Sequence, residues 1–328
     1  MSWDLIGHGW AADLLAEHIA KQQLRHAYLI TGPQGIGRRT LSLRLAQAVN
    51  CLRPPAPGQP CQACSSCRQI ERMQHPDLSI VHSEPPSIEI KIDQIRMLQR
   101  TLALSPYQAN YRVALLLDFE EARENAANAL LKTLEEPASR VILVLTAESI
   151  ERLPPTIVSR CEHLRLRPVP VEQLSQSLQS QHHIDPDVAR KLAHISAGRP
   201  GYAIELEQDK QRLDQRITWL DDHYRLLGEN RVERFAYAET AAKDKESLRA
   251  LLPIWASLWR DVALQATGAS VPLTNIDRQA EITTLAERFG LHVAMSVIQL
   301  LEHTNELIDQ YVNARLAAEV LMLDLPRR

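Results

Sequence analysis

Hydrophobic positions in the first half of the chain alternate between short continuous runs and helical spacing. Continuous apolar runs, each bounded by polar residues, stand at 27–30, 113–117 and 141–145. Such runs are typical of strands that are buried on both faces of a parallel sheet. Apolar side chains recur at helical spacing over 12–24, 40–49 and 122–136,. The alternation of strands and helices predicts a three-layer α/β domain over residues 1–167.

The pattern changes after Pro168, where helical spacing dominates and no further strand-like run stands out. A short helical cluster over 168–209 predicts a small helical domain. The remainder, 210–328, contains long amphipathic stretches such as 247–265 and 291–323, and it predicts a helical bundle,. The sequence therefore predicts an α/β part followed by an all-α part.

The composition is that of an ordinary globular protein. Of the 328 residues, 45% are hydrophobic and 23% charged, with a net charge of −3, so any contact with nucleic acid must use a local basic patch,. Only 5% are aromatic, which counts against a β-sandwich or a base-stacking sheet. No apolar run approaches the roughly 20 residues that span a bilayer, and no signal-peptide pattern is visible. We expect a soluble, cytoplasmic protein.

Four of the five cysteines stand close together in the sequence, at Cys51, Cys61, Cys64 and Cys67. Zinc takes four soft ligands in a tetrahedron, and a Cys-x2-Cys spacing lets two thiolates from one turn face one ion. Because disulfides are rare in intracellular proteins, the cluster predicts a structural zinc module at 51–67. A coincidental thiol cluster or a redox pair is the alternative. Cys161 stands alone and is interpreted as a buried, small apolar residue.

A glycine-rich turn follows the first apolar run. A working phosphate loop reads G-x-x-x-x-G-K-[ST]: backbone amides cradle the phosphates, the lysine reaches their oxygens and the hydroxyl holds Mg²⁺. Gly32, Gly35 and Gly37 are present, but the next two positions are Arg38 and Arg39. Arg38 can attract phosphate with a larger, planar group. Arg39 removes the hydroxyl ligand for Mg²⁺. The sequence therefore predicts a loop that keeps the glycine spacing but lacks the side chains that bind Mg²⁺ and phosphate in a working site.

The second nucleotide signature is altered as well. A hydrolytic site of this class follows its strand with a Mg²⁺-linked Asp and then a Glu that polarises water. Here Asp118 is followed by Phe119, and Glu120 and Glu121 come one and two positions late. Either glutamate is a conceivable substitute, but the shift aims its carboxylate elsewhere. The two defects predict that the chain does not hydrolyse ATP.

Several ordered motifs resemble those of the AAA+ clamp-loader family of the bacterial DNA polymerase III holoenzyme. They are His26–Ile30 before the glycine turn, the four-cysteine module, Ile92–Arg96, Ala126–Pro137 and Ser159–Cys161. The run Asn-Ala-Leu-Leu-Lys-Thr-Leu-Glu-Glu-Pro at 128–137 is long and unusual, so chance is a poor explanation. The resemblance covers the first two hundred residues. Over 210–328 it rests on helical character and on a terminal Asn313–Leu316.

The resemblance implies a RecA-like AAA+ domain with an inserted zinc module, a small helical lid and a C-terminal helical collar. In that family, five subunits, among them gamma/tau and delta, form a ring through their collars. The ring opens the sliding clamp and loads it at primer–template DNA during replication. No polymerase carboxylate constellation is visible in this chain, so the resemblance implies a component of the holoenzyme without polymerase activity of its own.

The resemblance also assigns roles to single residues. Arg160, which alone would be taken for a solvated charge, matches the arginine that projects into the ATP site of the neighbouring subunit. Thr146 matches the polar sensor at the end of the strand 141–145. The arginine of a second sensor is replaced by Gly201. This third missing part argues against ATP binding in the chain's own site.

Residues of the helical stretch 122–136 and of the helical segment near Asp93 also have simple structural interpretations. Ala129, Leu130 and Leu134 are interpreted as core residues, and Lys132, Glu135 and Glu136 as solvated charges. Arg96 and Arg100 lie on a helical segment near Asp93, where contact with a DNA phosphate and plain solvation are both open.

Two alternative functions remain beside a subunit that does not hydrolyse ATP. The first is an active clamp-loader ATPase of the gamma/tau type, which shares the zinc module and the Ser-Arg-Cys motif. Arg38, Arg39, Phe119 and Gly201 all argue against it. The second is an independent zinc-dependent nucleic-acid binder, which the negative net charge and the lack of a basic or aromatic stripe oppose,.

Overall fold

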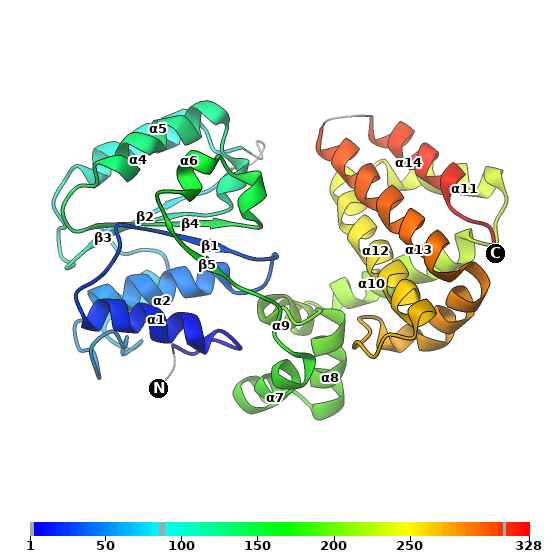
Figure 1. The fold of residues 1–328 in the computed structure, drawn as a ribbon, viewed down its shortest axis with the longest axis horizontal. Helices are drawn as coiled ribbons and strands as arrows, with labels where there is room; N and C mark the ends of the chain where they lie inside the picture. Colours follow the sequence, from blue (N-terminus) through cyan, green and yellow to red (C-terminus); the bar gives the residue numbers. More distant parts are fainter. Residues whose placement is uncertain (1–2, 85–88, 311–312) are drawn as a thin grey trace. The chain divides into compact units, whose positions relative to one another are not determined.

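The computed structural model of the chain describes residues 3–84, 89–310 and 313–328. The chain divides into two units, one formed by residues 1–177 with 198–202 and the other by 178–197 with 203–328 (Figure 1). Met1 and Ser2, which belong to the N-terminal segment considered for a signal sequence, lie outside the described residues. The predicted boundaries after residues 167 and 209 stay predictions.

Five parallel strands form the sheet of the first unit. They are β1 (Ala27–Thr31), β2 (Leu78–Val81), β3 (Arg112–Leu116), β4 (Val141–Ala147) and β5 (Glu162–Arg165), and they lie side by side in the order β2-β3-β4-β1-β5. In this register Ala27 lies opposite Leu143, and Tyr28 lies opposite Glu162. The carboxyl ends of β1, β3 and β4 therefore meet at one edge of the sheet, where ligands bind in open α/β sheets.

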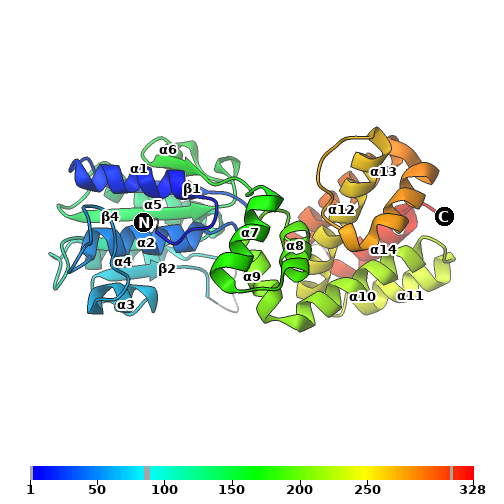
Figure 2. The same cartoon turned by 90° about the horizontal axis from the view of Figure 1, so that it is seen from below.

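Helices cover both faces of this sheet. One face carries α1 (Gly9–Ala20), α2 (Arg38–Asn50) and α3 (Ser65–Glu71); the other carries α4 (Ile92–Leu102), α5 (Glu124–Glu135) and α6 (Pro155–Val158) (Figures 1 and 2). Successive strand residues face opposite layers, so Tyr28 packs in the core with Leu45, whereas Leu29 packs in the other core with Leu130,. The predicted three-layer, RecA-like α/β arrangement is confirmed.

The sheet edges depart from the sequence prediction. β2 and β5 were not predicted, and they are the two outermost strands. An edge strand is covered incompletely, so it lacks the continuous apolar run that marks a central strand; β5 is the polar Glu-His-Leu-Arg,. The predicted helix over 122–136 is shorter, because Phe119–Glu121 forms a 3-10 turn before α5 begins at Glu124.

The described residues beyond Pro168 contain helices and no strand, as the pattern predicts. The helices are α7 (Val171–His182), α8 (Pro186–Ile195), α9 (Pro200–Gln208), α10 (Lys210–Leu226), α11 (Arg231–Ala241), α12 (Lys245–Thr267), α13 (Gln279–Asp309) and α14 (Ala314–Asp324). The long amphipathic stretch 291–323 is divided between two of them. The Asn313 side chain accepts the N–H groups of Arg315 and Leu316, and this cap starts α14 as a separate helix,.

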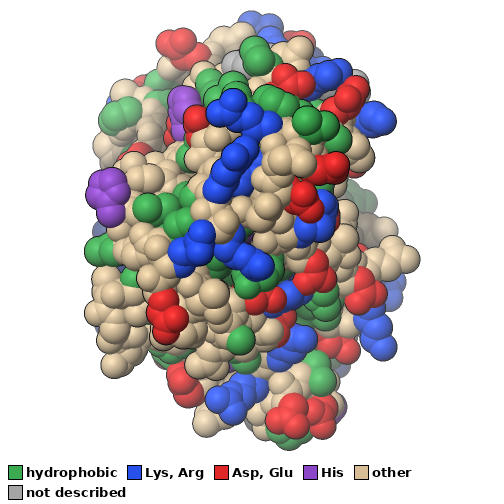
Figure 3. Space-filling view, turned by 90° about the vertical axis from the view of Figure 1, so that its right-hand side faces the viewer, with side chains coloured by type: hydrophobic (Ala, Val, Ile, Leu, Met, Phe, Trp, Pro, Cys, Tyr) green, Lys and Arg blue, Asp and Glu red, His purple; other side chains and the backbone are tan. Residues whose placement is uncertain are grey.

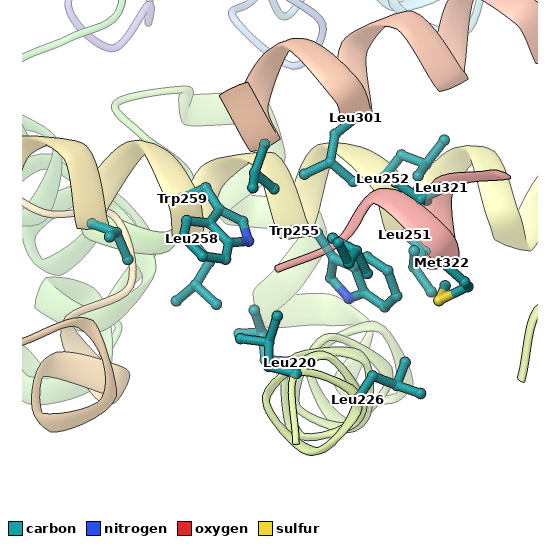
Figure 4. Close-up of a cluster of buried hydrophobic side chains, with 14 of the residues drawn as sticks. Leu220, Leu226, Leu251, Leu252, Trp255, Leu258, Trp259, Leu301, Leu321 and Met322 are labelled. Atoms are coloured by element: carbon teal, nitrogen blue, oxygen red, sulfur yellow. The ribbon is translucent and has the colours of Figure 1, made fainter. Parts of the chain in front are cut away.

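Two tryptophans of α12 form the centre of the second unit's core. Trp255 and Trp259 are fully buried among leucines of α10, α12, α13 and α14 (Figure 4). Trp259 donates its indole N–H to Nε2 of buried His223 over 2.7 Å, and burial lowers the pKa of His223 to about 3.

On the face drawn in Figure 3, Lys and Arg side chains lie among acidic and apolar ones.

Candidate functional site: a closed phosphate loop, a four-cysteine centre and a partly exposed arginine

The glycine turn connects β1 to α2 at the centre of the sheet. Its three glycines all have positive φ angles, and a Cβ on Gly35 would lie 2.7 Å from the Cβ of Tyr202. The amide of Gly201 donates to the carbonyl of Gly35 over 2.7 Å, and His8 Nε2 donates to the carbonyl of Ile36 over 3.0 Å. The start of α9 and the segment before α1 therefore close tightly on the loop.

Arg38, the first residue of α2, turns its guanidinium toward the carboxylates that follow β3. Its side chain is only 8% exposed, and Nη2 lies 2.9 Å from Oδ1 of Asp118. Nη1 lies 3.9 Å from Oε1 of Glu120, whose side chain is 10% exposed. An internal cation thus stands against Asp118, the position at which the sequence pattern predicts a Mg²⁺-linked aspartate.

The carboxylates are fixed by the ends of β3 and β4. Thr146, buried at the end of β4, accepts the backbone N–H of Asp118 over 2.9 Å, so the structure brings the predicted sensor position to Asp118. Glu120 accepts the N–H of Glu148 over 2.9 Å. Burial raises the pKa of Glu120, against the opposing effects of backbone N–H groups and of Arg38. Phe119, at the position of the missing glutamate, is buried in the core.

Arg39 plays no part in this cluster. Its guanidinium is exposed and donates to the sulfur of Met73 over 2.9 Å. Of the two arginines that follow the glycine turn, Arg38 alone therefore faces Asp118 and Glu120.

The four predicted cysteines converge in the structure, and their sulfur atoms all lie within 4.8 Å of one another. Four ligands at the usual zinc–sulfur distance of about 2.3 Å would place the sulfurs about 3.8 Å apart, so the cluster fits a tetrahedral ion. Backbone N–H groups point at these sulfurs: Cys61 N–H lies 3.2 Å from Sγ of Cys51, and Cys64 N–H lies 3.3 Å from Sγ of Cys61. The cluster can hold a metal ion.

Backbone donors also favour the thiolate form at one of these ligands. The N–H of Ala63 is the largest influence that lowers the pKa of Cys61, to about 6. Cys161 takes no part in the cluster: it is half-buried against the core beneath α5 and α6, where burial raises its pKa to about 12. The interpretation of Cys161 as an apolar packing residue agrees with this environment.

A buried polar network ties the cysteine module to α2. Gln47, 1% exposed, donates to the carbonyl of Cys67 over 2.8 Å and to Glu71 over 2.9 Å. Arg44 donates to the Gln47 side chain and pairs with Glu71. The indole of Trp3 donates to the carbonyl of Gly58 over 3.0 Å. The module is therefore attached to the helix that begins with Arg38.

Arg160 lies in the turn between α6 and β5, with a side chain that is 34% exposed. Its Nη2 donates to Oε1 of Glu135 over 2.6 Å, and its Nη1 donates to the carbonyl of Thr156 over 2.9 Å. Sequence reasoning missed the pairing with Glu135, which was interpreted as solvated. No local pattern signals this pair, because the two residues are 25 positions apart.

The other candidate residues keep their simpler interpretations. Leu130 and Leu134 are buried in the core and Ala129 packs against it, as predicted. Lys132 and Glu136 are exposed. On α4, the exposed Arg96 lies 3.6 Å from Asp93, and Arg100 is exposed. A role of Arg96 and Arg100 in contacting phosphate stays a prediction.

Comparison with known proteins finds relatives that carry replication names. The family model described as DNA polymerase III, delta subunit, matches residues 7–170. The DNA polymerase III subunit delta' of Bacillus subtilis is 34% identical over 203 residues, which cover 62% of this chain and 60% of that protein. The delta' subunit of Pseudomonas aeruginosa is 34% identical over 223 residues, covering 66% of each.

A tau subunit is also similar, and coverage is partial throughout. The DNA polymerase III subunit tau of Escherichia coli is 30% identical over 208 residues, covering 62% of this chain and 32% of that protein. The chain spans 60% and 66% of the lengths of the two delta' relatives. Within the described part of the chain, no helix is both long and apolar enough to cross a membrane.

Proposed function

The chain belongs to the family of DNA polymerase III delta subunits, and from this premise we propose that it is a delta-prime subunit of the clamp loader. It helps to load the sliding clamp on primed DNA, and it does not hydrolyse ATP itself. It works beside gamma/tau and delta subunits in a five-membered ring.

The observation that carries this proposal is the ion pair between Arg38 and Asp118. A Mg²⁺–nucleotide complex needs the lysine position to face phosphate and the aspartate to face the metal. In this chain the residue at the lysine position neutralises the aspartate directly, over 2.9 Å. Arg39 offers no hydroxyl, Phe119 no carboxylate and Gly201 no cationic side chain. The ion pair between Arg38 and Asp118 therefore occupies the site in which a Mg²⁺–nucleotide complex would bind.

Arg160 is proposed to assist ATP hydrolysis in the neighbouring subunit, not in this chain. An arginine finger stabilises charge on the γ-phosphate of ATP in the adjacent subunit. The guanidinium of Arg160 is partly exposed, and its hydrogen bonds with Glu135 and Thr156 hold it in place. We assign to Arg160 the role of a finger that acts in trans.

Zinc is the ion that the four cysteines fit best. Bound by Cys51, Cys61, Cys64 and Cys67, it would crosslink residues 51–67 and leave no open coordination position,. Its role is therefore structural: the module holds α2 through Gln47 and Arg44. The C-terminal helices are proposed to form the collar through which the subunits associate.

Reconstitution of the loader tests the trans role. Arg160→Ala should lower the clamp- and DNA-stimulated ATPase rate at the site it serves by roughly 10³-fold. Arg152→Ala is the matched control, because Arg152 is an exposed arginine whose side chain pairs with the exposed Glu148 on the same surface. It should leave the rate unchanged. An unchanged rate with Arg160→Ala, in a loader that assembles normally, refutes the finger assignment.

An active ATPase of the gamma/tau type is the alternative, since a tau subunit is 30% identical to part of the chain. The paired Arg38 and Asp118 weigh against it. An independent nucleic-acid binder gains no support, because the cysteine module is packed into the first unit through Trp3 and Gln47.

A further inference from the structure

Glu135 ends α5 beside Arg160, and the two side chains form an ion pair. The Oε1 atom of Glu135 lies 2.6 Å from Nη2 of Arg160. We propose that Glu135 is a positioning residue for Arg160: it holds the guanidinium in the orientation that a neighbouring subunit's phosphate needs. This inference rests on the proposed role of Arg160 as a finger.

The place of Glu135 in its helix supports a role outside the helix. Glu135 is the last residue of α5, and Glu136 caps the same end. The carboxyl end of a helix carries partial negative charge, so acidic residues there are unfavourable. Arg160 offsets this repulsion for Glu135, and no ion pair does so for Glu136 among residues 3–84, 89–310 and 313–328. Both glutamates depart from the usual preference at this helix end, and Glu135 is the one whose carboxylate meets the proposed finger,.

Arg160 is held from two sides by rigid elements. Nη1 donates to the carbonyl of Thr156 in α6, whose next residue, Ile157, is fully buried. Nη2 donates to Glu135, whose neighbour Leu134 is also buried. An exposed arginine loses much rotamer freedom when it is fixed in one orientation. Because the hydrogen bonds with Thr156 and Glu135 already fix the Arg160 side chain, this loss of conformational entropy occurs before a partner subunit binds.

The pairing leaves part of the guanidinium available. An arginine has five N–H groups, and within the part of the chain that the structure describes, the contacts of Arg160 involve Nη1 and Nη2 only,. The Nε–H group takes part in none of these contacts, and Nη2 has a second hydrogen,. These groups can donate to phosphate oxygens, for which arginine is well suited.

The test compares Glu135→Gln with Glu136→Gln in the reconstituted loader. Both variants remove one negative charge from the same helix end, but only the first loses the ion pair. Exposed ion pairs are worth enough to change an equilibrium roughly two- to fivefold. We therefore expect Glu135→Gln to lower kcat of the stimulated ATPase roughly two- to fivefold, with KM for ATP and ring assembly unchanged. Glu136→Gln should match the unaltered loader.

A double-mutant cycle separates positioning from an independent effect. With Arg160→Ala already present, Glu135→Gln should have no further effect on kcat. A further loss in that background overturns the inference, as does an unchanged or increased rate with Glu135→Gln alone. If Arg160→Ala itself leaves the rate unchanged, the proposed function fails and this inference with it. If Arg160→Ala lowers the rate but Glu135→Gln leaves it unchanged, the positioning role of Glu135 is refuted and the proposed function of Arg160 stands.

Side-chain dynamics of the isolated chain give a second readout. In nitrogen-15 relaxation, the order parameter of the Arg160 Nε–H bond should fall in Glu135→Gln and stay unchanged in Glu136→Gln. If the order parameter is unchanged in both variants, the contacts of Nη1 with Thr156 and Ser159 hold the arginine without Glu135. That result would overturn the positioning role of Glu135.

Discussion

Arg38 and Arg160 have the same side chain and opposite surroundings. Arg38 is 8% exposed and pairs with Asp118 and Glu120 of its own domain, whereas Arg160 is 34% exposed and pairs with one carboxylate at a helix end. The first arrangement pairs the positive charge with carboxylates inside the site, and on the proposed function it leaves no cation for a nucleotide. The second keeps part of the guanidinium available to a partner. If the proposed function holds, a nucleotide-binding fold has lost its own ATP site and still contributes a residue to the site of another subunit.

The largest effect on stability should come from breaking the four-cysteine metal centre, which is attached to α2, the helix that begins with Arg38. Cys67→Ser should reduce the bound zinc from about one ion per chain to near zero, measured by elemental analysis. Structural zinc sites contribute on the order of 10 kcal/mol of binding free energy to folding. We expect faster hydrogen exchange in α2, which Gln47 joins to the module, and unchanged exchange around Arg160.

Cys161→Ser is the matched control for the metal centre, because Cys161 lies outside the four-sulfur cluster. It should keep its zinc. Full zinc content in Cys67→Ser would show that Cys67 is not a ligand, and equal exchange in α2 would show that the module does not support that helix.

The next effect concerns the closed site itself. Arg38→Met leaves Glu120 buried without its cation and should lower the free energy of unfolding by about 2 kcal/mol. The loss is smaller than for a fully buried pair, because Asp118 is half-exposed. Urea unfolding measures it. Arg39→Met, one position along, should change the free energy of unfolding by less than about 0.5 kcal/mol. Equal losses in both variants would contradict the internal pairing.

A smaller effect tests the contact between α9 and the glycine turn. A Cβ on Gly201 would lie 2.9 Å from the carbonyl oxygen of Gly35, so Gly201→Ala must displace backbone. Overpacking of this kind costs on the order of 1 kcal/mol. Gly9→Ala is the control, since a Cβ there meets nothing within 4 Å. If thermal unfolding shows Gly201→Ala to be as stable as the control, the turn is not closed tightly.

The pH dependence of unfolding gives the smallest effect. Burial raises the pKa of Glu120 from its ordinary value of 4.5. A carboxyl group with a raised folded-state pKa contributes stability below its unfolded pKa, and loses it as the pH rises through the folded pKa. The unaltered chain should therefore gain stability relative to Glu120→Gln as the pH falls from about 7 to about 4.5. A parallel pH dependence of the two chains would contradict the burial of an ionised Glu120.

Much of the fold could be predicted from the sequence, because central strands produce continuous apolar runs and amphipathic helices produce apolar residues at helical spacing. β1, β3 and β4 are continuous apolar runs, whereas the edge strands β2 and β5 are not. The cysteine cluster could be predicted because its spacing is local.

The ion pairs of the site could not be predicted in the same way. Arg38 meets Asp118 only because β1 and β3 flank β4 in the sheet, and that order is not written in any local pattern. Glu135 meets Arg160 because the chain between them, which forms β4 and α6, returns to the end of α5. The sequence could name these residues as candidates, but tertiary packing decides which charges meet.

Calorimetric titration of the isolated, zinc-loaded chain with Mg²⁺ and a slowly hydrolysed ATP analogue tests the central claim most directly. If Arg38 closes the site from within, no heat of binding should be seen up to millimolar ligand. Binding with a micromolar Kd would mean that Arg38 leaves Asp118 and serves the phosphate in place of lysine. That result would contradict the closed site and favour an ATPase of the gamma/tau type.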